Sequence, residues 1–169
     1  MDFADLVKKR YSVRAYKPDA VEEEKLSAVL DAAIIAPTAA NRQPFRLFVI
    51  DTVINKEKLQ QLYSRDWLAQ APLVIGIAAV VDEAWTRRQD GVNYADVDAT
   101  IAFDHLIMQA ADLGLGTCWI AAFDPAVARE LLDLPDNWIP VAFTPIGYPA
   151  DEIRPKKRRE KNEIVKFLI

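Results

Sequence analysis

The middle of the chain contains an uninterrupted apolar run, Leu73–Val81, which limits the folds open to this sequence. Val, Ile and Ala make up most of it, so both alternating sets of side chains are apolar. A membrane span needs roughly 18 apolar residues, and this shorter run therefore predicts a strand. Because a strand that is apolar on both faces must be covered on both faces, we expect it to lie centrally in a sheet with helices on either side.

The rest of the chain mixes helical and strand-like patterns without strict alternation. Helices are predicted over 21–36, 55–70, 98–113 and 125–132, with a short helix capped by Asp2 before them, and further strands over 45–50, 117–120 and 138–146. This order favours one domain of the α+β class, an α/β/α sandwich with a mixed, mostly antiparallel sheet. The five glycines form neither GxGxxG nor GxxxxGK[ST], so a Rossmann fold and a P-loop are not expected.

Positive charge is concentrated near the end of the chain. The formal net charge is −4, but residues 154–161 (RPKKRREK) hold six cations and one anion, so the remainder carries −9. Such a run has three interpretations: a solvated tail, a nonspecific nucleic-acid patch, or a site for a phosphate group. The acidic body would repel nucleic acid, and no aromatic side chain is interleaved for base stacking, so we expect no nucleic-acid partner.

The composition also limits other kinds of site. A single Cys excludes an internal disulfide, and one Cys with one His leaves too few ligands for a structural zinc site, so no metal is expected. We expect Cys118 to be a buried inert thiol and His105 to be a satisfied core histidine on the apolar face of its helix. The charged N-terminal stretch is not typical of a secretory signal and no membrane span is predicted, which favours a cytoplasmic protein.

Two segments far apart in the chain carry alternating cations. Arg10 and Arg14 flank Ser12, and in an extended segment these side chains would form a fork for a phosphate. Three solvated surface residues are the simpler explanation of such a pattern taken alone. Near the other end of the chain, Lys156 and Arg158 also alternate and could hold one phosphate.

Two further segments offer amides and backbone N–H groups instead of charge. The loop 37–44 is framed by prolines, and its Asn41 and Gln43 can each donate and accept hydrogen bonds, as ribityl hydroxyls or an amide-like ring edge require. An ordinary loop with polar tips explains it equally well. Within residues 114–124, small residues at 121–122 leave backbone N–H groups accessible; a plain helix-to-strand connection is the alternative.

Taken in order, these segments resemble the motifs of a known family. RYSVRAY, APTAANRQPFRLFVI, GLGTCWIAAFD and PIGYP…PKKR occur in the order found in the nitroreductase family of FMN-dependent NAD(P)H oxidoreductases, and the resemblance spans nearly the whole chain. It implies a small single-domain member over residues 1–169, in which 150–169 form a C-terminal arm with phosphate-binding residues and an apolar tail. It also implies an intertwined homodimer with FMN at the subunit interface. Packing on a partner subunit would hide the apolar tail, which lies beyond the charged run.

The reaction implied by the resemblance is ping-pong hydride transfer through flavin N5. NADH or NADPH is the electron donor, and the acceptor is a nitroaromatic, a quinone or a similar small molecule. Two alternatives remain open: a flavin-dependent reductase of another acceptor in the same fold, for example a dehalogenase-like enzyme, and a non-catalytic FMN-binding protein. A plain α+β domain with a basic tail would lack the cofactor altogether.

The resemblance implies cofactor-binding roles for residues of all four segments: Arg10, Tyr11, Ser12, Arg14, Pro37, Thr38, Ala39, Asn41, Gln43, Trp119, Ile120, Ala121, Ala122, Lys156 and Arg158. Arg10 and Ser12 match the positions that grip the FMN phosphate and ribityl chain. Lys156 and Arg158 match a second phosphate clamp, and the other cations of the basic run are expected to be solvated.

The remaining implied roles concern the flavin ring. Arg14 matches a cation near flavin N1 and O2, where it would stabilise negative charge. The backbone of Ala121 and Ala122 matches the segment beside N5, although several family members have an acidic residue followed by Gly there. Residues 37–41 match a loop given by the partner subunit. No catalytic acid or base is implied.

Overall fold

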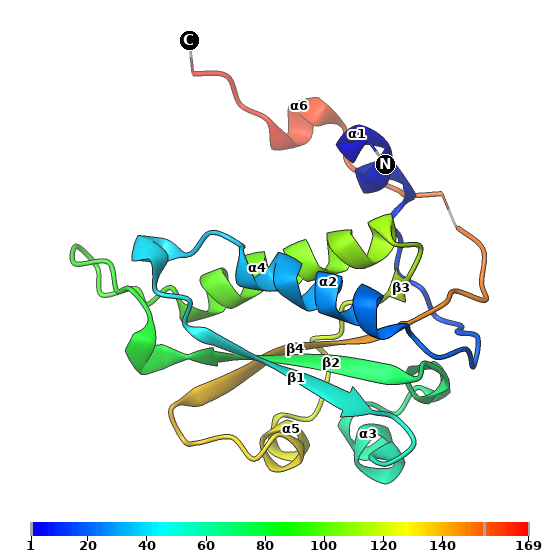
Figure 1. Ribbon diagram of the computed structural model, residues 1–169. Helices are drawn as coiled ribbons and strands as arrows, with labels where there is room; N and C mark the ends of the chain where they lie inside the picture. Colours follow the sequence, from blue (N-terminus) through cyan, green and yellow to red (C-terminus); the bar gives the residue numbers. More distant parts are fainter. Residues whose placement is uncertain (1, 154, 169) are drawn as a thin grey trace.

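Four strands form an antiparallel sheet within residues 2–153 and 155–168, which the computed structural model describes (Figure 1). The sheet has the order β1-β2-β4-β3. Its strands are β1 (Phe45–Asp51), β2 (Leu73–Val80), β4 (Trp138–Gly147) and the two-residue β3 (Gly116–Thr117). Each neighbouring pair runs antiparallel. The predicted central strand and its two long neighbours are therefore confirmed.

The strand β2 lies in the interior of the sheet, as its apolar sequence predicts. Every residue from Val74 to Val80 is buried. Its register places Ile77 opposite Leu47 of β1 and Ala142 of β4. Because side chains on both faces of β2 are apolar, the sheet needs a layer of helices on each side.

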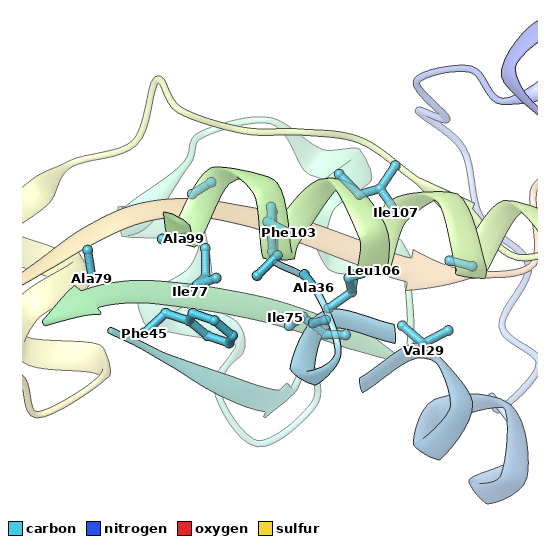
Figure 2. Packing of buried hydrophobic residues seen from close by; sticks show 14 of the residues in the cluster. Val29, Ala36, Phe45, Ile75, Ile77, Ala79, Ala99, Phe103, Leu106 and Ile107 are labelled. Carbon is cyan, nitrogen blue, oxygen red and sulfur yellow. The ribbon is translucent and has the colours of Figure 1, made fainter. Parts of the chain in front are cut away.

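Both helical layers are present, and the predicted α/β/α sandwich is confirmed (Figure 1). One face of the sheet carries α2 (Glu23–Ile34) and α4 (Ala95–Asp112), and the other carries α3 (Lys56–Leu62) and α5 (Pro125–Leu131). Figure 2 shows Val29 of α2 and Phe103 and Leu106 of α4 packed over Ile75 and Ile77 of β2. The side chain of Asp124 accepts hydrogen bonds from the backbone at the start of α5, which confirms it as the predicted N-cap.

The helix predicted over 55–70 is wrong in its length. The helix α3 ends before Tyr63, which is extended, and a 3₁₀ helix follows over Asp66–Gln70. The interruption lets Leu59 and Leu68 face one apolar cluster between the sheet and α5. A continuous helix would place these two leucines on opposite faces, because nine residues advance by about 900°. Burial of both side chains therefore decides against one long helix.

The expected burial of His105 is wrong. The buried stripe of α4 runs through Ala99, Phe103, Leu106 and Ala110, and His105 lies outside it and is exposed. Its Nδ1 lies 3.0 Å from a backbone carbonyl oxygen one turn earlier in the same helix. The histidine is therefore partnered locally, at the surface of the helix.

The predicted strand over 117–120 is shorter than expected. Of the predicted strand, only Thr117 belongs to the regular ladder between β3 and β4, and the next contact along the segment is an isolated bridge between Ile120 and Phe143. Between them, the Cys118 backbone N–H donates to the Thr144 hydroxyl at 2.9 Å, which replaces a ladder hydrogen bond by a side-chain one. At the N-terminus, Asp2 precedes α1 (Phe3–Lys9) but its side chain makes no capping bond, contrary to the prediction.

The C-terminal arm leaves the sandwich. It carries the short helix α6 (Lys161–Ile164) and projects away from the sheet and its helical layers (Figure 1). Its apolar side chains are uncovered, with Ile164, Phe167 and Leu168 exposed by 65%, 71% and 96%. Ile169, which the predicted tail includes, lies outside the described residues. None of the helices described here is both long and apolar enough to cross a membrane.

Candidate functional site

A cavity of about 300 Å³ joins the two cationic segments, which are separated by some 140 positions in the chain. Both forks predicted from the sequence contribute to it, together with residues that sequence reasoning missed. Its lining residues are Arg10, Tyr11, Ser12, Arg14, Asp151, Glu152, Pro155, Lys156, Lys157 and Arg158. The structure thus brings together the N-terminal and C-terminal cations at one place.

The N-terminal segment reaches this place because it pairs with the end of the sheet. Val13 donates its N–H to the Thr117 carbonyl at 2.9 Å, and Ser12 forms a parallel bridge with Thr117. Gly116 permits this approach, since a Cβ at that position would lie 2.7 Å from Val13 Cγ2. On the other side of the segment, Ala15 accepts an N–H from Ala150 at 2.8 Å. The residues around Arg10 and Arg14 are therefore held between β3 and the start of the C-terminal arm.

Asp151 fastens the two segments together and was not predicted. One of its carboxylate oxygens accepts the Arg14 backbone N–H at 2.8 Å, and the other accepts the Tyr11 hydroxyl at 3.1 Å. The same hydroxyl proton is shared with the backbone carbonyl oxygen of Asp151, which lies 2.9 Å from the Tyr11 oxygen. Burial and the neighbouring Asp151 raise the pKa of Tyr11 to about 12, so this hydroxyl stays protonated and keeps donating at neutral pH. The one sequence signal for Asp151 is its position as an acid immediately after the turn that precedes the basic run.

Lys156 bridges α1 and the cavity. Its ammonium donates to the carbonyl oxygens of Val7 and Lys8 at 2.6 and 2.7 Å, at the C-terminal end of α1, where a cation is favourable. Burial lowers the pKa of Lys156, and repulsion from Arg10 and then Arg158 lowers it further. These three cations are therefore close enough to repel one another, and an anion between them would relieve that repulsion.

The charge balance of the cavity fits a phosphate monoester. Five of its lining residues are cationic and two are acidic, and one acid, Asp151, already accepts two hydrogen bonds. A phosphate monoester carries about −1.5 to −2 charges at neutral pH and accepts hydrogen bonds from guanidinium and ammonium groups. Lys157 also lines the cavity, although we expected it to be solvated, whereas Arg159 does not line it. Arg154 lies outside the described residues.

The proline-framed loop does not reach this cavity within one chain. Residues Ala39–Asn41 form a 3₁₀ turn that precedes β1, and the turn lies at the opposite end of α4 from β3 (Figure 1). Of the predicted loop residues, Pro37, Asn41 and Gln43 are exposed, while Thr38 and Ala39 are half-buried. The Gln43 side-chain amide donates to the Asn41 side-chain oxygen at 3.0 Å, so part of their hydrogen-bonding capacity is used locally.

The segment after β3 also lies outside the cavity lining. Trp119 packs edge-on against Phe103, with ring centroids 5.0 Å apart, and keeps 36% of its surface exposed. Ile120 is buried, and its N–H donates to the Phe143 carbonyl at 2.8 Å, so this backbone donor is used within the sheet. The next two residues, at 121–122, are exposed.

Cys118 and the acidic residues of α4 do not form a metal site. Cys118 is 4% exposed, and burial raises the pKa of its thiol, which agrees with the inert thiol that we expected. Over residues 2–153 and 155–168, no three His, Cys, Asp or Glu side chains gather in a way that could hold a metal ion.

The chain matches a described family over most of its length. Residues 7–63 and 53–148 fit the model of the Nitroreductase family. These two matches together include the N-terminal fork, the loop after α2 and the segment after β3. They end before the C-terminal cations, whose place in the site is given by the cavity alone.

Similar proteins include two with solved structures and one named relative. A nitroreductase family protein from Clostridium difficile 630 is 41% identical and superposes with a TM-score of 0.91, covering 100% of this chain and 99% of that one. An FMN-dependent nitroreductase from a second Clostridium difficile strain is 31% identical, with a TM-score of 0.79 and 99% of each chain covered. A protein named FMN reductase (NAD(P)H) from Bacillus subtilis is 30% identical over 87% of this chain and 66% of its own length.

Proposed function

The chain belongs to the nitroreductase family, and we propose that it is an FMN-dependent oxidoreductase that uses NADH or NADPH to reduce a small-molecule acceptor. The acceptor in this proposal is a nitroaromatic, a quinone or a similar compound. Support comes from the similar proteins whose names include FMN, nitroreductase or NAD(P)H. The observation that carries the proposal for this chain is the cationic cavity between its two ends.

The cavity would hold the phosphate of FMN. Arg10, Lys156 and Arg158 supply charge; burial and then repulsion from Arg10 and Arg158 lower the pKa of Lys156, and an anion among these cations would relieve the repulsion. Ser12 lines the same cavity and would donate a hydroxyl to the phosphate or to the ribityl chain. Asp151 keeps the N-terminal segment and the arm in register, so that both sets of cations face the same space.

When bound, FMN supplies the hydride chemistry, taking a hydride from NAD(P)H and passing it to the acceptor. The protein supplies position and charge. The cationic guanidinium of Arg14 would lie beside flavin N1 and O2, where negative charge develops. The Arg14 guanidinium donates one 3.3 Å hydrogen bond to the Ser12 carbonyl, and its other N–H groups are left for a ligand. Residues 121–122 are exposed, and their backbone would face the reacting edge of the ring.

We further propose that the site is completed in a cytoplasmic homodimer. Within one chain the loop 37–43 lies away from the cavity, so it would join the site only from a second copy (Figure 1). The uncovered side chains of Ile164, Phe167 and Leu168 supply an apolar surface that such a copy would cover. If each arm packs on the partner subunit, the apolar tail is covered and the loop of one subunit can join the cavity of the other.

An absorbance spectrum followed by anaerobic reduction tests the proposal. The purified protein, reconstituted with FMN and desalted, should keep the flavin bands, and stoichiometric NADH or NADPH should bleach them. Adding a nitroaromatic or a quinone should then restore the colour without oxygen. A protein that retains flavin but is bleached by neither nucleotide would be a non-catalytic FMN-binding protein. A protein that retains no flavin would overturn the proposal.

A further inference from the structure

We propose that Asp98, in the first turns of α4, is the positioning residue that fixes the conformation of the loop Pro37–Pro44. Its side chain reaches the loop from the core, because Asp98 Oδ1 accepts the Ala39 backbone N–H at 2.9 Å. The consequence for cofactor binding rests on the function proposed above, whereas the anchoring of the loop does not.

The loop has a backbone conformation that its residues do not favour. Ala40, Asn41 and Gln43 have φ values of 52°, 54° and 48°, in the left-handed region that residues with a Cβ rarely adopt. Asn tolerates this region, but Ala and Gln have no comparable preference for it. Three such residues within four positions persist only where the surrounding structure determines them. The loop therefore needs an anchor outside its own residues.

Several hydrogen bonds of the loop are internal and do not tie it to the rest of the molecule, and at its end the Pro44 carbonyl accepts the Val80 N–H of β2 at 2.8 Å. The Gln43 backbone N–H donates to Thr38 Oγ1 at 3.1 Å, and both partners move with the loop. The Arg42 guanidinium reaches the Ala84 carbonyl at 3.5 Å, a long contact from an exposed side chain. The bond from Ala39 to Asp98 is much shorter and joins the loop to a helix of the core.

The surroundings of Asp98 make it a rigid anchor. Asp98 is only 2% exposed, and its helical neighbours Ala95 and Ala99 belong to the main apolar cluster. The start of α4 is favourable for a carboxylate because of the helix dipole. The second carboxylate oxygen, Oδ2, is buried without a hydrogen-bond partner among the described residues. Because a buried carboxylate is costly, its presence here is best explained by the bond that it makes to the loop.

This anchor sets the direction of the polar tips of the loop. Ala39 begins the 3₁₀ turn, and the left-handed residues follow immediately, so fixing its N–H fixes where the turn starts. The exposed Asn41 and Gln43 project from that turn. Under the proposed function these two side chains meet the cofactor bound by the partner subunit. Asp98 itself touches neither cofactor nor substrate.

Four variants separate the anchoring bond from packing and from charge. Asp98→Leu fills the volume and removes the acceptor, and Asp98→Ala removes both. Asp98→Asn keeps an oxygen that can accept the Ala39 N–H. Asp96→Ala is the matched control, because Asp96 is an exposed acid in the same turn of α4. Thermal melting of each variant first establishes that it is folded.

The readouts are the rate of tryptic cleavage after Arg42 and the Kd for FMN. Arg42 lies in the loop and is exposed, and cleavage after the exposed Arg88, in a separate hairpin, is the internal reference. We expect Asp98→Leu and Asp98→Ala to speed cleavage after Arg42 at least fivefold relative to Arg88 and to raise the Kd about tenfold. Asp98→Asn and Asp96→Ala should stay within about twofold of the unchanged protein in both readouts.

Several results would overturn the inference. Unchanged cleavage after Arg42 in Asp98→Leu would show that the loop is fixed without Asp98, and Asp98→Asn behaving like Asp98→Leu would exclude the hydrogen bond as the cause. A loosened loop with unchanged FMN affinity would remove the link to the cofactor. If the unchanged protein binds no FMN while the cleavage pattern is as expected, the proposed function fails and the anchoring by Asp98 stands.

Discussion

At the scale of single residues, neighbouring cations of the basic run differ in what they face. Arg158 lines the cavity, whereas Arg159, next to it, does not, although both side chains are exposed. Simple alternation does not explain the difference, because Lys156, Lys157 and Arg158 line the cavity in succession; the lining ends at Arg158. The pair therefore offers two equal charges, one inside the site and one outside it.

We expect Arg158→Ala to raise the Kd for FMN about tenfold at low salt, because it removes a charge-assisted hydrogen bond to the phosphate. Arg159→Ala should change it by less than about twofold. The difference should shrink as the salt concentration rises, since added salt screens exposed charges. Fluorescence titration of FMN at two salt concentrations measures it. Equal effects of the two substitutions would show that the run attracts FMN only through its overall charge.

The lowered pKa of Lys156 gives the binding of FMN a pH dependence. A lysine binds phosphate only when protonated, and Lys156 loses its proton at a lower pH than the usual 10.5 because of burial, Arg10 and Arg158. FMN affinity should therefore fall as the pH rises toward 10.5. In Lys156→Arg the side chain stays charged, so the fall should be smaller. Parallel pH profiles of the two proteins, measured by flavin fluorescence, would contradict this role of Lys156.

At the scale of elements, the shortest strand has the largest effect on the site. β3 contains only Gly116 and Thr117, yet it holds the N-terminal segment against the sheet. The close approach of Val13 requires that residue 116 has no side chain. Together with the hydrogen bonds from the arm, this steric requirement places Ser12 and both arginines of the first fork.

Gly116→Ala should lower the free energy of unfolding by about 1–3 kcal/mol, because the new methyl group overlaps Val13. It should also weaken FMN binding by displacing the segment that carries Ser12. Val13→Ala in the same chain should recover part of both losses by making room for the methyl group. Urea unfolding and FMN titration of the single and double variants measure these effects. If the losses of stability and of FMN affinity in the double variant equal the sum of the losses in the two single variants, this contact is excluded as the cause.

At the scale of the whole molecule, the two parts of the proposed site lie at opposite ends of α4 and do not meet within one chain. The cationic cavity lies beside β3, and the loop that carries Asn41 and Gln43 lies beyond the opposite end of α4 (Figure 1). The arm with its apolar tail extends outward from the sandwich (Figure 1). A second copy that covers the tail and supplies the loop would account for both arrangements.

Charges placed on the tail should disrupt such a dimer. We expect Phe167→Asp with Leu168→Asp to shift the protein from dimer to monomer and to lower FMN affinity, since aspartate at a buried apolar contact is costly. The control is Val53→Asp with Ile54→Asp, an apolar pair that is 83% and 82% exposed in the turn after β1. Light scattering after gel filtration measures the mass. A dimer that survives the tail substitutions would show that the tail does not hold it together.

Local sequence patterns were enough to predict the layers of the fold. The apolar run of β2, the helical spacing of α2 and α4 and the cap at Asp124 all act locally, and each element formed where its pattern predicted. Where helical spacing and the burial of apolar side chains favoured different structures, local sequence patterns were not enough to predict the outcome. The predicted helix over 55–70 broke because both Leu59 and Leu68 had to be buried on one face.

Which polar residues meet depends on how the layers pack in three dimensions. The alternating cations could be found in the sequence because spacing of two is a local property, but their meeting in one cavity depends on pairing across the sheet end. Asp151 and Asp98 have no comparable local signal. Each acts through one or two hydrogen bonds to a distant segment, and such partners are set by how the layers pack, which no short stretch of sequence encodes.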